Sequence, residues 1–433
     1  MNIRKIKFQP KKPDEISRLV AWESDYGQEV EQVVKDIIGS VRHMGDKALV
    51  DYTEKLDRHL VNDVKQLRVS QEQLVEAWES IGDEVRKALQ LAKNRISEYA
   101  ERQKITNWQL TEADGSIMGQ KITPLDSVGL YVPGGQAAYP SSVLMNAIPA
   151  KVAGVSRLVM TSPAMDGELN QYVLAAAFLC EVDEYYTIGG AQAIAALAYG
   201  TESISPVDKI VGPGNIFVAT AKRQVFGQVD IDMMAGPSEI AIIGDGSAPA
   251  KWAAADLFSQ AEHDVNAQAI LITTSEAYAN EVVEAMRSML NDMPRREIIE
   301  QSMTERGAVI LVDDIEQAVA VVDLIAPEHL EILTENAMDI AQRVKHAGAI
   351  FVGPYSCEAL GDYVAGPNHV LPTSGTARFS SPLGVYDFQK RSSLIYCTAD
   401  KASELAKSAK RLAETEGLPA HALSAQLRIQ FES

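Results

Sequence analysis

Apolar residues recur along the first hundred residues with the spacing of amphipathic helices. One apolar stripe is formed by Ile38, Val41, Ala48, Leu49 and Tyr52. The stretch from Glu72 to Gln103 is rich in helix-forming residues and contains no proline. This pattern predicts α-helices that bury one face, and we expect a structural role for both stretches.

Beyond Pro124 the pattern changes to short apolar runs that alternate with helical stretches such as Ala191–Tyr199 and Phe217–Phe226. Such alternation is typical of α/β folds with mainly parallel sheets. The predicted strands are too many for one sheet, so we expect two Rossmann-like α/β globules. A helical C-terminal stretch should follow, interrupted at Gly417 and Pro419. The predicted strands are Ser127–Val132, Arg157–Thr161, Glu184–Ile188, Lys209–Val211, Glu239–Ile243, Ala269–Thr273, Val309–Val312 and Ala349–Val352.

The composition is that of a globular protein, with 46% hydrophobic and 23% charged residues among 433. No apolar run reaches the roughly 20 residues that a membrane span needs. The segment Met1–Pro13 is basic and polar and lacks the apolar core of a secretory signal. We therefore expect a cytoplasmic protein without a membrane partner.

Charge and cysteine content exclude further classes. The net charge of −19 would repel a phosphate backbone, so we expect no nucleic-acid partner, although a local anion site is still allowed. The three cysteines, Cys180, Cys357 and Cys397, lie far apart in the sequence. They fit neither a disulfide framework nor a cysteine-rich zinc module, and we expect free thiols.

Two histidine segments could supply metal ligands or proton-transfer groups. Gln260 and His263 lie three positions apart at the end of a predicted helix, where both could face one metal site. Glu328 and His329 follow Pro327, which is favoured in the first turn of a helix, so we expect this pair near a helix N-terminus. A carboxylate beside an imidazole offers two proton-transfer groups of different pKa. On the residues alone, Gln260 and His263 are better explained as a polar helix end. For Glu328 and His329, a capped helix start and a proton-transfer pair are favoured about equally.

Two further histidine segments differ from each other in setting. The segment Leu360–Pro372 follows a predicted strand and places glycines and prolines around Asp362, Asn368 and His369. Loops after parallel strands often carry functional sites, which favours a site here. The segment Glu416–His421 lies in the C-terminal stretch, away from any predicted strand. Its spacing alone favours a surface turn.

Glycine-rich turns lie at the ends of several predicted strands. Glycine lets the backbone approach a ligand closely, and the N-terminus of a following helix favours phosphate. None of the turns has the Gly-x-Gly-x-x-Gly spacing of the standard dinucleotide fold. Together they predict a glycine-walled cleft for an anionic cofactor, formed by Tyr131–Gly135, Gly189–Gln192, Gly212–Asn215 and Ala235–Ser238.

Taken together, these segments resemble the histidinol dehydrogenase family. The resemblance runs in order from about Val128 to the C-terminus, whereas the N-terminal part is similar only in its general pattern of apolar and polar residues. It is carried by Tyr131–Gly135, Tyr139–Met145, Gly189–Leu197, Gly212–Asn215, Ala235–Glu239, Gln260–Asp264, Ala326–His329, Gly361–Pro372 and Glu416–His421.

The resemblance implies a role for each matching residue. Glu328 and His329 would be the catalytic pair. One zinc ion per subunit would be bound by Gln260, His263, Asp362 and His421, a chemically reasonable set of two imidazoles, one carboxylate and one amide. Besides these ligands and His329, the substrate would contact Ser238, His369 and Glu416. NAD would contact Tyr131, Gln192 and Asn215.

The implied activity is a four-electron oxidation in the final steps of histidine biosynthesis. L-Histidinol would be oxidised through L-histidinal to L-histidine, with two NAD consumed per substrate. Zinc would hold the substrate rather than generate a hydroxide. His329 would take the hydroxyl proton, and Glu328 would activate the water that attacks the aldehyde.

The resemblance also implies a homodimer in which Glu416 and His421 complete the site of the partner subunit. We expect an N-terminal arm over 1–26 and a main α/β domain of 27–132 and 239–380 that carries the zinc and catalytic residues. An inserted α/β domain would span 133–238. A C-terminal arm over 381–433 would hold the dimer together with the N-terminal one.

Three alternatives remain on the residues alone. A family member could oxidise another small alcohol or diol, although Ser238, His369 and Glu416 favour L-histidinol. A zinc hydrolase could use the same ligand types, but it would not need the glycine turns. A catalytically silent binding protein would not need Glu328 and His329.

Overall fold

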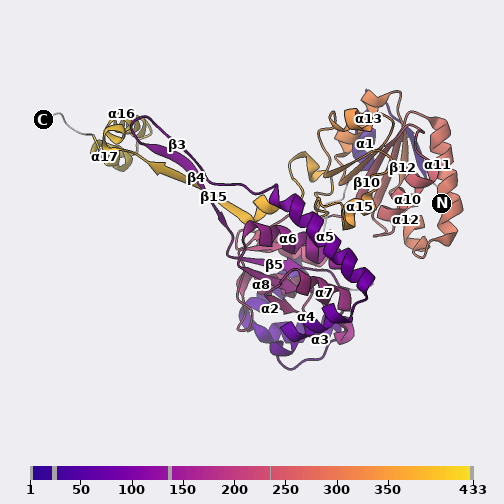
Figure 1. Cartoon of the computed structure of the whole chain (residues 1–433), viewed down its shortest axis with the longest axis horizontal. Helices are drawn as coiled ribbons and strands as arrows, with labels where there is room; N and C mark the ends of the chain where they lie inside the picture. The colour runs from indigo at the N-terminus through magenta and orange to yellow at the C-terminus, as the bar shows by residue number, and fades with distance from the viewer. Residues whose placement is uncertain (1–2, 22–26, 135–138, 235, 430–433) are drawn as a thin grey trace. The chain divides into compact units, whose positions relative to one another are not determined.

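The computed structural model describes residues 3–21, 27–134, 139–234 and 236–429. The chain divides into two units. Figure 1 shows the whole chain, coloured by residue number. Unit 1 comprises Met1–Gln103 and Leu125–Asp387, and unit 2 comprises Lys104–Pro124 and Phe388–Ser433. Gly135 and Ala235, which belong to two of the predicted glycine turns, lie outside the described residues. No helix in the described part of the chain is long and apolar enough to cross a membrane.

The first sheet of unit 1, here called sheet A, has six parallel strands in the order β1-β12-β11-β10-β13-β14. All residues of its inner strands β10, β11 and β13 are buried, as expected for a parallel sheet that is covered on both faces. The strands are β1 (Arg4–Lys7), β10 (Glu239–Gly244), β11 (Gln268–Thr273), β12 (Ala308–Leu311), β13 (His329–Leu333) and β14 (Ala349–Val352).

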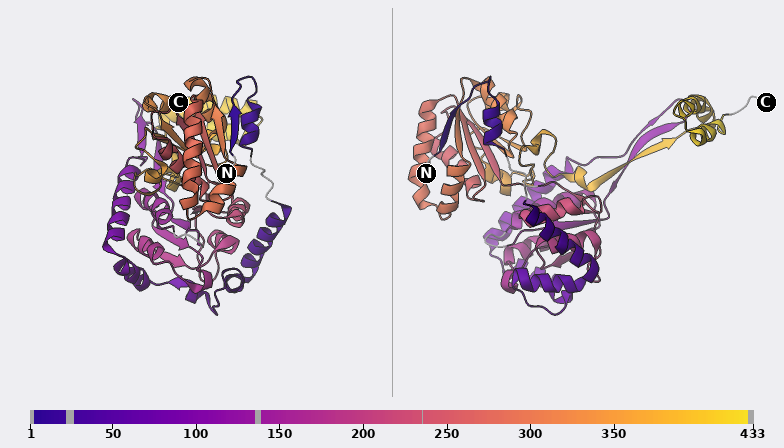
Figure 2. Two further views of the ribbon diagram at one scale, coloured as in Figure 1. Left: turned by 90° about the vertical axis from the view of Figure 1, so that its right-hand side faces the viewer. Right: turned by 180° about the vertical axis from the view of Figure 1, so that it is seen from behind.

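Helices cover both faces of sheet A (Figures 1 and 2). One hydrophobic core packs α10 (Ala250–Ala261), α11 (Glu276–Met289) and α12 (Arg296–Glu305) against the face that carries Ile240 and Leu271. A second core packs α1 (Asp14–Leu19), α13 (Ile315–Ile325) and α14 (Ala337–Ala341) against the face that carries Ile243 and Ile270. Consecutive apolar residues of each strand therefore point into different cores.

The second sheet of unit 1, here called sheet B, also has six strands, in the order β2-β7-β6-β5-β8-β9. All pairings are parallel except that of β2 with β7. The strands are β2 (Arg68–Val69), β5 (Ser127–Tyr131), β6 (Arg157–Thr161), β7 (Glu184–Tyr186), β8 (Lys209–Val211) and β9 (Asp230–Ile231). A core of its own joins this sheet to α2 (Gln28–Met44), α3 (Asp46–Asp57), α8 (Gly190–Tyr199) and α9 (Ile216–Val225).

Four further helices pack on one another beside sheet B. The pairs α4–α7, α5–α6 and α6–α7 are in contact, and α6 also contacts β5. Their bounds are α4 (Gln71–Ser80), α5 (Asp83–Glu101), α6 (Pro140–Ala153) and α7 (Gln171–Leu179). The remaining helical segment of unit 1 is α15 (Glu358–Tyr363), and the short 3-10 turns are Val64–Leu67, Met165–Gly167, Leu290–Asp292, Thr376–Arg378 and Val385–Phe388.

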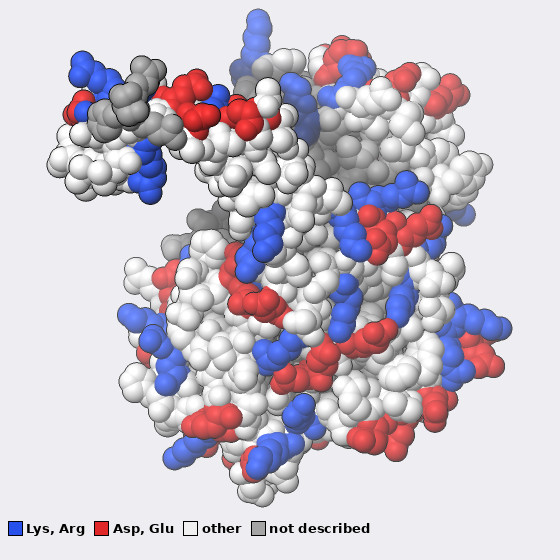
Figure 3. Space-filling view, turned by 60° about the vertical axis from the view of Figure 1, so that its left-hand side comes forward, with Lys and Arg blue, Asp and Glu red and all other residues white. Residues whose placement is uncertain are grey.

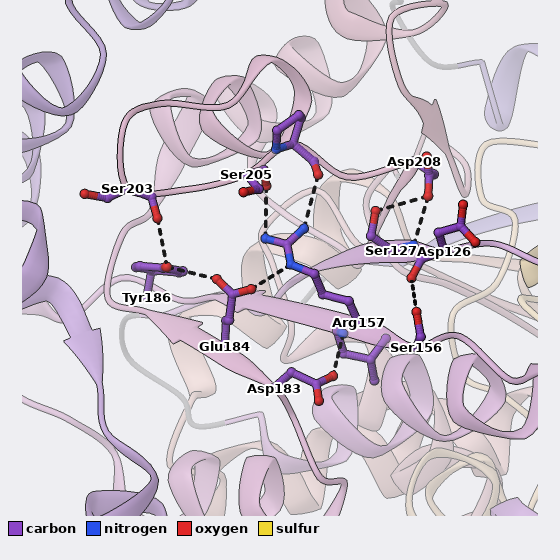
Figure 4. Close-up of polar contacts among 12 residues, drawn as sticks. Asp126, Ser127, Ser156, Arg157, Asp183, Glu184, Tyr186, Ser203, Ser205 and Asp208 are labelled. Carbon is purple, nitrogen blue, oxygen red and sulfur yellow. Dashed lines mark hydrogen bonds and ion pairs between the residues drawn. The ribbon is translucent and has the colours of Figure 1, made fainter.

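The amino-terminal ends of β5, β6 and β7 are joined by a polar network (Figure 4). The guanidinium of Arg157 donates to the carboxylate of Glu184 at 2.6 Å and to the carbonyls of Ser205 and Pro206 at 3.1 Å. Asp208 accepts hydrogen bonds from the backbone and hydroxyl of Ser127. The polar groups at this edge of sheet B are thus engaged in hydrogen bonds with other residues of the protein.

Unit 2 consists of a three-stranded antiparallel sheet, in the order β15-β4-β3, and two helices. The strands are β3 (Trp108–Thr111), β4 (Ile117–Pro124) and β15 (Gln389–Tyr396), and the helices are α16 (Ala399–Thr415) and α17 (Pro419–Gln426). Figure 2 shows that β4 and β15 run side by side as a long ribbon. The two helices are in contact with each other.

Acidic and basic side chains are interspersed over the face shown in Figure 3. Elsewhere in the described chain, exposed charges form ion pairs, such as Arg58 with Asp166 at 2.7 Å and Arg343 with Glu316 at 2.9 Å. The net charge of −19 is therefore not gathered into one acidic patch on this face.

The predicted α/β class and all eight predicted strands are confirmed to within a few residues. The first hundred residues are helical as predicted, but Gly45 separates α2 from α3 and Ile81–Gly82 separates α4 from α5. The C-terminal helices are interrupted where expected, between Thr415 and Pro419. The prediction missed β13 and the short or amphipathic strands β1, β2, β3, β4, β9 and β15.

The strands are grouped differently from the expected domain edges. We expected residues 27–132 to share a domain with 239–380, but β2 and β5 pair with the strands of 133–238 in sheet B. The N-terminal segment was expected to be an arm, but β1 completes sheet A by pairing with β12. Local periodicity identifies a strand, whereas its hydrogen-bonding partner is set by long-range packing.

Candidate active site

The predicted catalytic pair, Glu328 and His329, lies at the amino-terminal end of one strand of sheet A, beside the start of the neighbouring strand. His329 is the first residue of β13, and Glu239 is the first residue of the adjacent β10. The expected helix start at Pro327 is wrong. Helix α13 ends at Ile325, Ala326 takes a left-handed conformation at φ 51°, and the chain then enters β13. His329 is held there by pairing with both Ile240 and Ala349.

His329 is 3% exposed and lies between two carboxylates. Its Nδ1 lies 3.5 Å from the Glu328 carboxylate, and its Nε2 lies 3.7 Å from that of Asp362. Burial disfavours the charged imidazole, but these two carboxylates outweigh burial and raise the pKa of His329 well above its usual 6.5. Among the described residues Nε2 has no hydrogen-bond partner, which leaves it available to a ligand.

Backbone contacts fix the tautomer of His329 and the position of Glu328. Nδ1 of His329 donates to the carbonyl of Glu239 at 3.0 Å, so Nε2 is the nitrogen that can accept a proton. Oε2 of Glu328 accepts a hydrogen bond from the backbone N–H of Glu239 at 2.9 Å. Both members of the pair are therefore oriented by the first residue of β10.

Asp362 lies on α15 and is the acidic ligand candidate. Burial would raise its pKa, but His329 and His369 outweigh burial and lower the pKa of Asp362 to about 2. Glu358, His329 and Asp362 form a cluster whose ligand atoms lie within 4.8 Å of one another. In contrast to Asp362, Glu358 has a pKa that burial and the Asp362 charge raise to about 8. The carboxyl of Glu358 is thus harder to ionise than that of Asp362, and Asp362 is the better cation ligand.

Gln260 is placed in the last turn of α10, and His263 follows the end of that helix. Gln260 is fully buried, and neither its Oε1 nor its Nε2 has a hydrogen-bond partner among the described residues. An unpartnered buried amide is costly unless a ligand satisfies it. His263 is exposed, and its Nδ1 lies 3.3 Å from the hydroxyl of Ser238. An amide oxygen, an imidazole and an ionised carboxylate form a donor set that fits a zinc ion.

His369 belongs to the loop after α15. Its Nδ1 donates to the backbone carbonyl of Asp362 at 3.0 Å, and its Nε2 lies 3.4 Å from the hydroxyl of Ser142 on α6. Burial lowers the pKa of His369, so this imidazole is neutral at pH 7. The structure thus brings His369 next to Asp362, as the predicted loop site requires.

The predicted NAD contacts lie at the carboxyl-terminal edge of sheet B. Tyr131 ends β5, and its hydroxyl accepts a hydrogen bond from the backbone of Gly190 at 3.1 Å. Gln192 lies in the first turn of α8, fully buried and with both side-chain polar atoms unpartnered among the described residues. Asn215 caps α9, and its Oδ1 accepts from the backbone of Phe217 and Val218.

The glycine turns gather at the same edge. A side chain at Gly134 or Gly189 would collide with Pro163, and one at Gly212 would lie 2.0 Å from the carbonyl of Tyr131. A pocket of about 190 Å³ opens beside them, lined by residues that include Gly134, Pro163 and Asn170. Because β5 and β8 are neighbours whose chains continue in opposite directions across the sheet, this edge is also a topological switch point. The fourth predicted turn is placed elsewhere, since Ser238 precedes β10 of sheet A.

Two predicted site residues belong to unit 2. Glu416 follows α16, and His421 lies in the first turn of α17. Both are exposed. The other predicted site residues all belong to unit 1.

Three buried acids near the site were missed from the sequence, namely Glu239, Glu331 and Glu358. Glu331 accepts a hydrogen bond from the backbone N–H of Glu358 at 2.7 Å. Burial and the charge of Asp256 raise the pKa of Glu331 to about 9. A weak signal was available, because Glu331 lies two residues from His329 in a strand and Glu358 lies one helical turn before Asp362.

Comparisons with known proteins agree across the whole chain. The family model of histidinol dehydrogenase matches residues 22–429. A histidinol dehydrogenase of Methylococcus capsulatus is 58% identical over 416 residues, which cover 96% of this chain and 95% of the relative. That of Hydrogenovibrio crunogenus is 55% identical and covers 96% of each chain. The crystal structure of histidinol dehydrogenase from Elizabethkingia anophelis superimposes with a TM-score of 0.93 at 33% identity, covering 99% of this chain and 98% of that one.

Proposed function

Because this chain belongs to the histidinol dehydrogenase family, an NAD-linked and zinc-dependent group of oxidoreductases in histidine biosynthesis, we propose that its residues oxidise L-histidinol through L-histidinal to L-histidine as follows. The observation that carries the proposal is the buried pair Glu328 and His329 beside the ionised Asp362. These groups supply two bases and a cation ligand within a few ångströms of each other.

We propose that one zinc ion per subunit is held by Gln260, His263 and Asp362, with His421 as the fourth ligand. The buried, unpartnered amide of Gln260 and the low pKa of Asp362 support this set. When bound, zinc supplies a positive charge that holds the amino alcohol and neutralises Asp362. Ser238, His369 and Glu416 are the proposed further substrate contacts.

His329 is the proposed base for the alcohol. With a cation bound at Asp362, the pKa of His329 would fall, because one of the two carboxylates that raise it would be paired elsewhere. The neutral imidazole then accepts the hydroxyl proton at Nε2, since Nδ1 is held by the carbonyl of Glu239. In the second half of the reaction, Glu328 takes a proton from the water that attacks the aldehyde.

The proposed NAD site lies at the carboxyl-terminal edge of sheet B, with Tyr131, Gln192 and Asn215 as contacts. When bound, NAD supplies the hydride acceptor, and two molecules are consumed per substrate. The N-termini of α8 and α9 converge on the glycine turns, and helix N-termini favour phosphate groups. The unpartnered amide of Gln192 is a ready hydrogen-bonding group for the cofactor.

We also propose a cytoplasmic homodimer in which Glu416 and His421 complete the site of the partner. Unit 2 supports this, because it exposes large apolar side chains that a monomer would leave in water. Trp108 and Leu110 on β3 are 55% and 56% exposed, and Ile395 on β15 is 77% exposed. The cytoplasmic location follows from the role of the family in amino-acid biosynthesis.

The activity is tested by mixing the purified protein with L-histidinol and NAD and following NADH absorbance. We expect two NADH per L-histidinol, lost on zinc chelation and restored by added zinc. NADH from another amino alcohol or diol, but none from L-histidinol, would keep the reaction class and overturn the substrate.

The metal site is tested separately by zinc content. Gln260→Leu should lose zinc, whereas Gln268→Leu should retain it. The control residue is also buried, but its Nε2 already donates to the carbonyl of Leu19 at 3.2 Å. Equal zinc content in the two variants would overturn Gln260 as a ligand.

The shared site is tested by mixing two inactive variants, Glu328→Gln and His421→Asn. If each site draws His421 from the partner, a mixed dimer contains one intact site. Random pairing then restores about a quarter of wild-type activity, because about half of the dimers are mixed and each has one working site. No restored activity in proven mixed dimers would overturn the sharing.

A further inference from the structure

Glu239, which has no role in the proposed reaction, contacts both members of the catalytic pair. Resting on the proposed roles of Glu328 and His329, we infer that Glu239 is a positioning residue that holds the Glu328 carboxylate in place for the aldehyde step. Glu239 is 3% exposed and begins β10, directly beside the start of β13.

A reciprocal pair of hydrogen bonds joins the two glutamates. The backbone N–H of Glu239 donates to Oε2 of Glu328 at 2.9 Å, and the backbone N–H of Glu328 donates to Oε2 of Glu239 at 3.3 Å. Each side chain thus satisfies the backbone of the other residue at the point where the strands begin. Because Oε2 of Glu328 is engaged in this way, the side chain is held in one orientation.

The second oxygen of Glu239 is also used. Its Oε1 accepts the backbone N–H of Ser374 at 2.9 Å, and Ser374 is held in a left-handed conformation at φ 56°. A carboxylate can accept hydrogen bonds at both oxygens, whereas a glutamine offers one oxygen and one NH2 group. In Glu239→Gln, one buried backbone N–H therefore faces another donor, whichever way the amide turns.

The side chain of Glu239 acts only on the Glu328 end of the pair, where it accepts the backbone N–H of Glu328, whereas the backbone of Glu239 contacts both members. The carbonyl accepts Nδ1–H of His329 at 3.0 Å, and a side-chain substitution leaves that carbonyl in place. The inference therefore predicts a split between the two halves of the reaction. The aldehyde half needs the aligned Glu328 carboxylate, whereas the alcohol half needs Nε2 of His329.

The experiment measures the two halves separately in Glu239→Gln. Oxidation of added L-histidinal by NAD should fall about 100-fold, the cost of misplacing a catalytic group by about 1 Å. Reduction of L-histidinal by NADH, the reverse of the alcohol half, should fall by less than about threefold, because His329 keeps its backbone contact. Zinc content and the KM for NAD should stay at wild-type values.

Three further variants separate positioning from stability. Ile242→Val on the same strand should lower the melting temperature without changing the ratio of the two half-reactions. Combining Glu239→Gln with Glu328→Gln should oxidise L-histidinal no more slowly than Glu328→Gln alone, because Glu239 acts through Glu328. Glu239→Asp, which keeps the carboxylate but withdraws it by one methylene, should show the same split.

The inference is overturned if both halves fall equally, if the losses of the two glutamate variants multiply, or if Glu239→Gln behaves as wild type. Failure of both Glu239 variants to fold would assign Glu239 to the stability of sheet A alone and overturn it as well. If Glu328→Gln itself oxidises L-histidinal at the wild-type rate, the proposed role of Glu328 fails first.

Discussion

Sheets A and B share one architecture but carry their candidate sites at opposite edges. In sheet A the ionisable candidates lie where strands begin. Glu328 directly precedes β13, and His329 is the first residue of that strand. In sheet B the glycine turns gather where strands end, after β5 and β8. The general expectation that parallel sheets carry sites at their carboxyl ends thus describes sheet B and not sheet A.

The orientation of the covering helices explains this difference. In a parallel α/β sheet the helices run back against the strands, so their C-termini lie at the amino edge and their N-termini at the carboxyl edge. Helix C-termini favour cations and N-termini favour anions, each by about 0.3–1 kcal/mol. Gln260 lies in the last turn of α10, whereas Gln192 lies in the first turn of α8. One architecture therefore offers one edge that favours cations, where the proposed zinc site lies, and one that favours anions, where the proposed NAD site lies.

The largest expected effect comes from breaking the chemistry of sheet A. His329→Asn should lower kcat by about 10²- to 10⁴-fold, because it removes the proposed general base. NAD affinity should stay at the wild-type value if sheet B alone binds the cofactor. Rates from NADH absorbance and NAD binding by calorimetry test both statements. A parallel loss of NAD affinity would contradict the separation of the two edges.

At the carboxyl edge of sheet B, removing one charge from a buried ion pair should lower the free energy of unfolding. Lys222 pairs with Asp232, and their side chains are 3% and 1% exposed. Both also bind the backbone of Gly212. Lys222→Met leaves a buried carboxylate unpaired, so the free energy of unfolding should fall by about 3–5 kcal/mol. Urea unfolding at neutral pH measures this loss.

The control for that ion pair lies on β8. Lys209 pairs with Asp230 at 2.8 Å, but the side chain of Asp230 is 52% exposed. Lys209→Met should therefore cost only about 0–1 kcal/mol, because water solvates the remaining carboxylate. Equal losses for the two lysine variants would show that burial does not decide the value of these pairs.

A smaller effect is expected from Gln192, which lies at the carboxyl-terminal edge of sheet B, where the proposed NAD site is. Gln192→Leu removes an amide that has no hydrogen-bond partner among the described residues, and it should raise the KM for NAD about tenfold, which corresponds to about 1.4 kcal/mol of binding. The same change should raise the stability of the cofactor-free protein by about 1 kcal/mol, since an unpartnered buried amide is removed. Steady-state kinetics measure the change in the KM for NAD, and thermal unfolding measures the change in stability. An unchanged KM would remove Gln192 from the NAD site.

The effect that is smallest per pH unit concerns the pH dependence of stability at sheet A. The pKa of Glu331 is raised from 4.5 to about 9, so in this window the folded state binds more protons than the unfolded state. Stability from this group must then fall as pH rises through the window. Glu331→Gln should flatten the slope by less than about 1 kcal/mol per pH unit. Urea unfolding between the two pKa values tests this, and a steeper slope in the variant would contradict it.

The sequence by itself determined the α/β class, the strand–helix alternation, the glycine turns and the family. It also brought out Glu328, His329 and Asp362 as candidates for chemistry. Each of these follows from local features, namely hydrophobic periodicity, turn residues and short ordered motifs. Such features depend on residues that are neighbours in the chain, so they can be identified in the sequence directly.

Only the tertiary structure decided which strands share a sheet and which edge carries the candidate site. The segment after Pro327 became the strand β13 because it pairs with β10 and β14, both distant in sequence. Glu239, Glu331 and Glu358 gained their importance by burial next to that strand. Strand pairing and burial depend on contacts between residues far apart along the chain, and a local pattern does not specify such contacts.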